Sequence, residues 1–212
     1  MKTSIALKTL LGAGALTLPL MAFAESNVQT GTATASPGAT AHVDFSIVIP
    51  KILYLRVGSG STYTSGTLAS ANTIDLITFS PAAGTVGNST PVAGTGGDLT
   101  GGGETAAIVS NSGNVTLNAT ASGALGNGNG DTIPFTQITT AATTLTSSTQ
   151  LPAPVLTNGT SSNVVLTAPA TKLIVEDAKW TYSYANAANV PAGTYGGVNV
   201  NNSRVTYTAT MP

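Results

Sequence analysis

The sequence predicts an all-β protein, an antiparallel Greek-key sandwich that follows an N-terminal signal peptide. Many short stretches of alternating or β-branched residues recur at intervals of about 8–12 residues, separated by Gly, Pro and Asn. No sustained 3.6-residue apolar period follows the first 24 residues. Charged residues make up 7% of the chain and hydrophobic residues 42%, which is enough to bury a core and unlike a disordered chain.

The first 24 residues have the pattern of a secretory signal. The basic residues Lys2 and Lys8 precede an apolar run from Leu10 to Phe23, and a small-x-small cleavage sequence ends at Ala24. The run is shorter than the roughly 20 apolar residues that span a bilayer, so no membrane insertion of the mature chain is expected. We therefore predict a secreted protein that starts at Glu25 and resides outside the cell, at its surface, or in the periplasm.

Composition also limits the partners of the mature chain. After residue 24 the chain keeps five basic and eight acidic residues, a net charge of −3, whereas nucleic-acid binding requires a basic surface. The chain has no cysteine, so a cysteine-linked lipid anchor is excluded and disulfides cannot stabilise the fold. A length of 188 residues after the predicted cleavage favours one domain.

The mature chain is predicted to begin with an arm. Residues 25–40 contain one sizeable apolar residue, Val28, and are interpreted as a flexible arm or weak edge strand. From residue 41 to residue 212 we predict a single β-sandwich domain. Its first strand is indicated by the alternation of Val43, Phe45, Ile47 and Ile49 with mostly polar residues, ending at Pro50.

Several further strands are predicted along the chain. The segments 105–109 and 115–120 flank an Asn/Gly-containing connector, which predicts a β-hairpin because Gly and Asn accept positive φ at low cost. Residues 81–103 are irregular and predicted to form a long surface excursion. Other strands are expected at 52–57, 73–79, 164–166, 173–175, 180–184 and 205–210.

The C-terminal strands resemble known bacterial surface proteins. The segments Trp180–Tyr184, Pro191–Tyr195 and Val205–Thr208 resemble the closing strands of spore coat U type fimbrial subunits and, less closely, WxL-type cell-wall-binding domains. The resemblance covers about 30 residues and implies an immunoglobulin-like sandwich on the cell surface. It departs from the fimbrial pattern in having no cysteine pair and from the cell-wall pattern in having a single tryptophan.

The sequence offers no convincing catalytic constellation. His42 is the one histidine and no serine lies in a nucleophile-elbow pattern, so base-assisted nucleophilic hydrolysis is not expected. Glu176 and Asp177 are the one adjacent acidic pair, and we interpret them as a solvated turn between strands rather than as glycosidase acids. The prediction is a protein that is not an enzyme.

Two binding hypotheses remain open. Residues 126–131 partly resemble a glycine-rich calcium turn, so Asp131 is a candidate calcium ligand, with Asp98 and Glu104 in the other long loop as further oxygen donors. The calcium hypothesis competes with an ordinary mobile loop. Trp180, Tyr182 and Tyr184 share one strand face and could form an aromatic stripe for a glycan, although such spacing is more typical of a core.

The composition and strand pattern together favour a structural or adhesive surface protein, such as a fimbrial or extracellular-matrix subunit. Its expected partners are other copies or other surface proteins, because strand edges without Lys or Glu invite pairing with another chain. The alternative is a monomeric module that binds a carbohydrate or another surface ligand.

Overall fold

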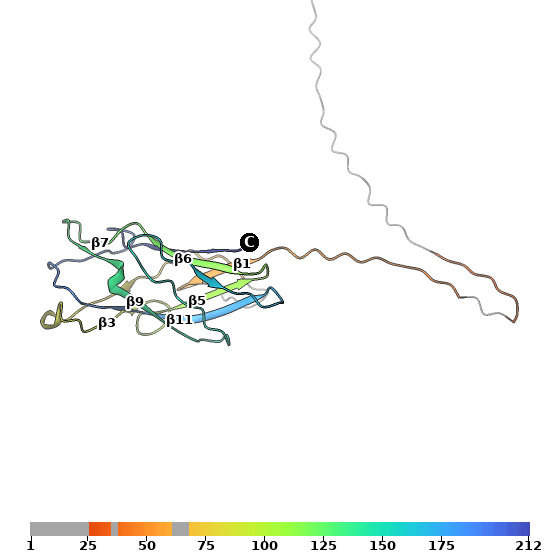
Figure 1. Ribbon diagram of the computed structural model, residues 1–212, viewed down its shortest axis with the longest axis horizontal. Helices are drawn as coiled ribbons and strands as arrows, with labels where there is room; N and C mark the ends of the chain where they lie inside the picture. Colours follow the sequence, from red (N-terminus) through yellow and green to blue (C-terminus); the bar gives the residue numbers. More distant parts are fainter. Residues whose placement is uncertain (1–25, 35–37, 61–67) are drawn as a thin grey trace, which may run out of the picture. The chain divides into compact units, whose positions relative to one another are not determined.

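A computed structural model describes residues 26–34, 38–60 and 68–212 (Figure 1). The predicted signal peptide, residues 1–24, lies outside the described residues. The chain divides into two units, one that ends at Ile49 and a compact one that starts at Pro50. Residues 41–49, which were predicted to be part of the sandwich, therefore fall in the first unit.

The compact unit is built from antiparallel sheets, which confirms the all-β prediction, and every pairing between its named strands is antiparallel. The larger sheet has five strands in which β5 (Gly103–Ser110) and β11 (Ile174–Tyr184) are central, with β1 (Leu53–Val57), β3 (Val92–Ala93) and β9 (Ile138–Thr143) around them. The second sheet has the order β10 (Val164–Leu166), β6 (Val115–Ala121) and β12 (Val205–Thr210).

Short elements connect these sheets. Two small ladders pair β2 (Ile77–Thr78) with β4 (Thr95–Gly96) and β7 (Leu125–Gly126) with β8 (Thr132–Ile133). In the part of the chain that the structure describes, helix is limited to two 3₁₀ turns, Ala83–Thr85 and Phe135–Gln137. The predicted excursion at 81–103 contains one of these turns together with β3 and β4, so it is less irregular than expected.

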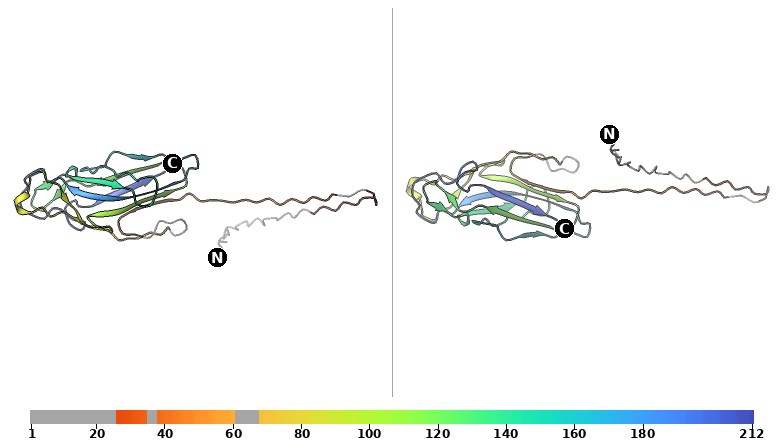
Figure 2. Two further views of the ribbon diagram at one scale, coloured as in Figure 1. Left: turned by 90° about the horizontal axis from the view of Figure 1, so that it is seen from below. Right: turned by 90° about the horizontal axis from the view of Figure 1, so that it is seen from above.

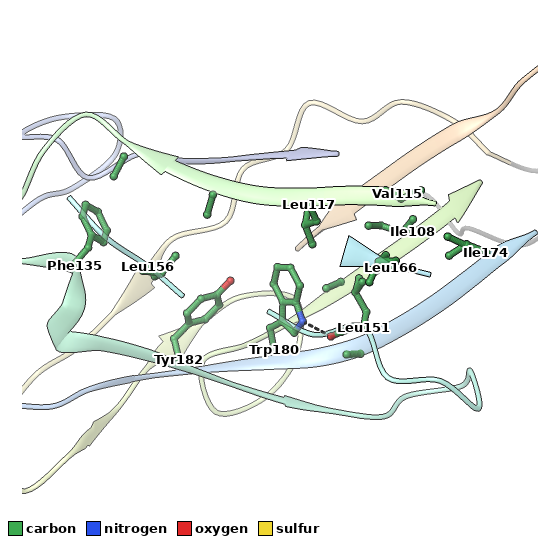
Figure 3. Packing of buried hydrophobic residues seen from close by; sticks show 14 residues of the cluster. Ile108, Val115, Leu117, Phe135, Leu151, Leu156, Leu166, Ile174, Trp180 and Tyr182 are labelled. Atoms are coloured by element: carbon green, nitrogen blue, oxygen red, sulfur yellow. Dashed lines mark hydrogen bonds between the residues drawn. The ribbon is translucent and has the colours of Figure 1, made fainter. Parts of the chain in front are cut away.

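The core lies between the two main sheets, which form two layers (Figure 2). Ile108 of β5, Leu117 of β6 and Trp180 of β11 are completely buried and face the same apolar interior (Figure 3). The indole Nε1 of Trp180 donates a hydrogen bond to the carbonyl oxygen of Leu151 at 3.0 Å, so its polar atom is satisfied. Trp180, Tyr182 and Tyr184, which the sequence analysis assigned to one strand face, are therefore part of the interior.

The predicted hairpin at residues 105–120 is wrong in its connection, although both strands form. β5 belongs to the larger sheet and β6 to the second sheet, so the connector 111–114 crosses between layers instead of joining paired strands. Both strands bury an apolar face, with Ala106 and Ile108 on one and Val115 and Leu117 on the other. Two faces that bury against each other belong to opposite layers about 10 Å apart.

Two other expectations differ from the structure. The strand predicted at 43–49 does not form, and its residues are exposed. The strands predicted at 173–175 and 180–184 are one continuous strand, β11, so Glu176 and Asp177 lie within a strand and not in a turn. No helix among the described residues is long and apolar enough to cross a membrane.

Candidate functional site

The aromatic residues proposed for glycan binding are not on the surface. Trp180, Tyr182 and Tyr184 are all buried, and the Trp180 ring packs against Tyr207 of β12 with ring centroids 5.3 Å apart. The hydroxyls of Tyr182 and Tyr207 share a hydrogen bond of 3.0 Å. These residues join the two sheets and belong to the core, which was the competing interpretation.

The adjacent acids Glu176 and Asp177 lie in strand β11, and their side chains point to opposite faces of the sheet. Successive side chains on a strand point to opposite faces, so the two carboxylates cannot flank one substrate. Asp177 is completely buried and accepts hydrogen bonds from the backbone and hydroxyl groups of Thr146 and Ser147. Its carboxylate anchors the 144–149 loop on the sheet.

Glu176 is half-buried and lines a cleft of about 410 Å³ together with Thr149, Pro169 and Leu173. Burial raises the pKa of its carboxyl group. No second acid lines this cleft among the described residues, so the paired-carboxylate chemistry of a glycosidase has no partner there. His42 is exposed and lies outside every strand of the described chain.

The calcium candidates Asp131 and Asp98 lie in separate loops with separate partners, and Glu104, expected in the loop of Asp98, lies in strand β5. Asp131 accepts a hydrogen bond from the side-chain amide of Asn127 at 2.8 Å, which closes the β7–β8 turn. Asp98 forms an ion pair of 2.8 Å with Arg56 and accepts a bond from the backbone of Thr105. Among the described residues no group of three or more acidic, histidine or cysteine side chains is arranged so that it could hold a metal ion. Calcium binding stays a prediction.

Residues 43–49 expose a run of apolar side chains. Val43, Phe45, Ile47 and Ile49 are between 71% and 87% exposed, with every second side chain apolar in an extended run. We call residues 43–49 the exposed segment. The alternation of apolar residues is visible in the sequence. It does not indicate that the segment has no sheet partner within the described chain.

The strands β1 and β12 are outer strands of the two main sheets. β1 follows β5 in the larger sheet, and in the described part of the chain β12 pairs only with β6. The two outer strands are neighbours, and Lys51 Nζ donates to the carbonyl oxygen of Pro212 at 2.9 Å. Their inward side chains are half-buried, in contrast with the completely buried residues of β5 and β6; they are Leu53, Leu55, Val57, Val205, Tyr207 and Ala209.

An open cleft follows the edge of β1. It has a volume of about 320 Å³, it is lined by every residue of β1, and its other wall includes Ala69, Ala71 and Thr73. The cleft therefore lies beside the incompletely covered apolar side chains of β1.

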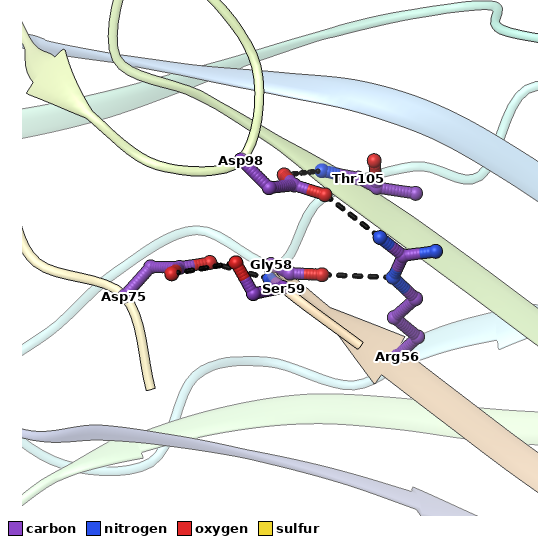
Figure 4. Close-up of polar contacts among 6 residues, drawn as sticks. All are labelled: Arg56, Gly58, Ser59, Asp75, Asp98 and Thr105. Carbon is purple, nitrogen blue, oxygen red and sulfur yellow. Dashed lines mark hydrogen bonds and ion pairs between the residues drawn. The ribbon is translucent and has the colours of Figure 1, made fainter. Parts of the chain in front are cut away.

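A polar cluster at the end of β1 was missed by the sequence reasoning. Figure 4 shows four of its residues, Arg56, Ser59, Asp75 and Asp98. The fifth is Glu104, whose carboxyl group is close to those of Asp75 and Asp98. These residues come from four separate stretches of chain, so no local motif marks them. Asp98 and Glu104 were considered together as oxygen donors, and the structure does bring them close. Nothing in the sequence indicated that Asp75 joins them.

Comparisons of the chain with family models, with curated proteins and with solved structures found no match.

Proposed function

We propose that this protein is a non-enzymatic structural or adhesive subunit of a bacterial surface, such as a fimbrial or extracellular-matrix subunit, and that it works by associating with other copies. The proposal includes secretion by the predicted signal peptide and a Greek-key, immunoglobulin-like arrangement of the two sheets. The spore coat U resemblance of the C-terminal strands supports both parts. The observation that carries the proposal is the exposed segment, residues 43–49.

The exposed segment has the properties of a strand that lacks its sheet. Phe45 and Ile47 are 87% and 86% exposed, and each apolar side chain of this size gains about 1.5–3 kcal/mol when it is fully buried. Alternation at period two places Val43, Phe45, Ile47 and Ile49 on one face, which suits a surface that is apolar on one side. A contiguous exposed apolar stretch of this kind marks an interaction site.

The open edge of β12 has the complementary properties. On the side away from β6 it has no ladder partner among the described residues, so an added strand can extend the second sheet, and the apolar face of that strand would cover the half-buried side chains of β12. The outward residues of β12 are Thr206, Thr208 and Thr210, so no charge protects this edge from pairing. We therefore propose that the exposed segment of one copy pairs at the β12 edge of a second copy.

The absence of cysteine from the sequence makes disulfide mapping a direct test. Ser46 lies on the polar face of the exposed segment, and Thr208 lies on the outer face of β12, so both positions accept cysteine without disturbing the apolar contact. Ser46→Cys and Thr208→Cys proteins, each with a different tag, are mixed and oxidised. A heterodimer joined between the two positions is expected.

Thr143→Cys is the matched control, because Thr143 is an exposed threonine on β9, which pairs only with β11 among the described strands and lies away from β1. Equal cross-linking of Ser46→Cys to both partners would contradict pairing at the β12 edge. A Ser46→Cys/Thr208→Cys double variant that closes only within one chain would contradict association between copies.

A further inference from the structure

The polar cluster at the end of β1 contains three carboxyl groups and one guanidinium group among its described members. Arg56 Nη2 lies 2.8 Å from Asp98 Oδ2, and the backbone N–H of Thr105 donates to Asp98 Oδ1 at 2.7 Å (Figure 4). The hydroxyl of Ser59 donates to Asp75 Oδ1 at 2.9 Å, and the Ser59 N–H donates to the same carboxylate. The cationic partner therefore serves Asp98 and not Asp75.

Glu104 is the third carboxyl group, and it is 7% exposed. It faces Asp75 and Asp98, and it shares a hydrogen bond with the hydroxyl of Tyr182, which in turn contacts the hydroxyl of Tyr207. Burial raises the pKa of Glu104 to about 7, with the negative charges of Asp75 and Asp98 adding to the effect and the Tyr182 bond opposing it. Both phenols stay neutral near pH 7, because burial raises the pKa of Tyr182 and that of Tyr207, the latter to about 12.

The two aspartates differ in how firmly they are held. Asp98 is bonded by a guanidinium group and by the backbone of β5, whereas Asp75 is bonded by Ser59 alone among the described residues. Asp75 lies in residues 68–76, which form no strand. Gly58, at φ +83°, allows its close approach, since a Cβ there would collide with the Asp75 carboxylate. Asp75 is thus the carboxylate that repulsion displaces most easily.

We propose that Glu104 makes the contact between residues 68–76 and β1 dependent on protonation. With a neutral Glu104, Asp75 stays on Ser59, and Ala69, Ala71 and Thr73 wall the cleft along β1. With an ionised Glu104, three carboxylates share one guanidinium group, Asp75 leaves Ser59, and the edge of β1 opens. This contact lies entirely within the compact unit, so the inference holds independently of whether the protein assembles.

The sign of the pH dependence follows from the direction of the shift. The pKa of the Glu104 carboxyl group is raised in the closed state, so its protonation stabilises that state. This stabilisation is complete below pH 4.5, the ordinary pKa of the group, and it is lost as the pH rises through about 7. The difference between the ordinary pKa of 4.5 and the raised pKa of about 7 limits this effect. The equilibrium constant for opening can increase by roughly three hundredfold at most.

The test is amide hydrogen exchange of residues 68–76 and of Ser59 at pH 5 and pH 8.5, corrected for the intrinsic exchange rates. In the unmodified chain we expect protection to fall at least tenfold between the two values. Glu104→Gln, which mimics the neutral acid, should keep protection at both. The matched control Glu176→Gln removes a half-buried acid elsewhere and should behave like the unmodified chain.

Asp75→Asn provides a second, independent variant. Removal of one neighbouring negative charge lowers the pKa of Glu104, so whatever pH-dependent loss of protection remains at Ser59 should begin at a lower pH and be smaller than in the unmodified chain. Equal protection of the unmodified chain at pH 5 and pH 8.5 would overturn the inference. A tenfold loss that persists in Glu104→Gln would overturn it as well.

Discussion

Residues 43–49 and strand β12 have nearly the same sequence pattern and different structures. In both, every second residue is apolar: Val43, Phe45, Ile47 and Ile49 in the first, and Val205, Tyr207 and Ala209 in the second. β12 pairs with β6 and half-buries its apolar face, whereas the exposed segment forms no ladder among the described residues. Alternation therefore indicates that a segment can join a sheet, whereas the presence of a partner strand determines whether the segment forms a strand.

The largest expected difference between the two regions is in folding stability. Leu117→Ala, in the strand that pairs with β12, should lower the free energy of unfolding by about 2–5 kcal/mol, because the side chain is completely buried. Phe45→Ala should leave the unfolding of the monomer within about 0.5 kcal/mol of the unmodified chain. Urea denaturation followed by Trp180 fluorescence measures both. A similar loss in Phe45→Ala would show that the exposed segment already packs in the monomer.

A second comparison concerns aspartates in the two units. Asp177→Ala should cost about 3 kcal/mol, because the backbone N–H groups of Thr146 and Ser147 lose their buried acceptor. Asp44→Ala, in the exposed segment, should cost nothing measurable. Thermal unfolding is compared at one pH for both variants, and equal melting temperatures would contradict the anchoring role of Asp177.

A smaller effect is expected at the hydroxyl pair between the sheets. Tyr207→Phe keeps the ring against Trp180 and removes the bond to Tyr182, so it should lower the free energy of unfolding by about 1 kcal/mol. Thr208→Ser, on the outer face of the same strand, serves as the control and should change little. A neutral Tyr207→Phe would show that the hydroxyl pair adds no stability to β12.

The smallest effect is expected at the start of the arm. Val28 is exposed but stands alone among small and polar residues, so it lacks the alternating apolar face of residues 43–49. Val28→Ala should alter neither unfolding nor assembly. Loss of assembly in this variant, measured by light scattering, would move the association site from the exposed segment toward residue 28.

The sequence predicted well what depends on local pattern. The β class and the strands 53–57, 164–166 and 205–210 follow from alternation and from the Gly, Pro and Asn between the strands. The sequence also left Trp180, Tyr182 and Tyr184 between two interpretations, and their burial decides for the core.

What the sequence could not predict depends on contacts between distant residues. The connector 111–114 looks like a hairpin turn, but the choice between pairing and crossing depends on which faces meet across the core. Glu176 and Asp177 look like a turn because both are polar, although Asp177 is buried by a loop 30 residues away in the sequence. The Arg56–Asp98–Glu104–Asp75 cluster combines residues whose spacing carries no local signal.

The central claim is that the apolar face of residues 43–49 associates with a second copy, and light scattering of the chain from Glu25 onward tests it most directly. The unmodified chain should form oligomers whose mass rises with concentration. Phe45→Asp, which places a charge on the apolar face, should be a monomer, while Ser46→Asp, which places the same charge on the polar face, should still assemble. An unmodified chain that stays monomeric at every concentration, or a Phe45→Asp variant that assembles like Ser46→Asp, would contradict the account.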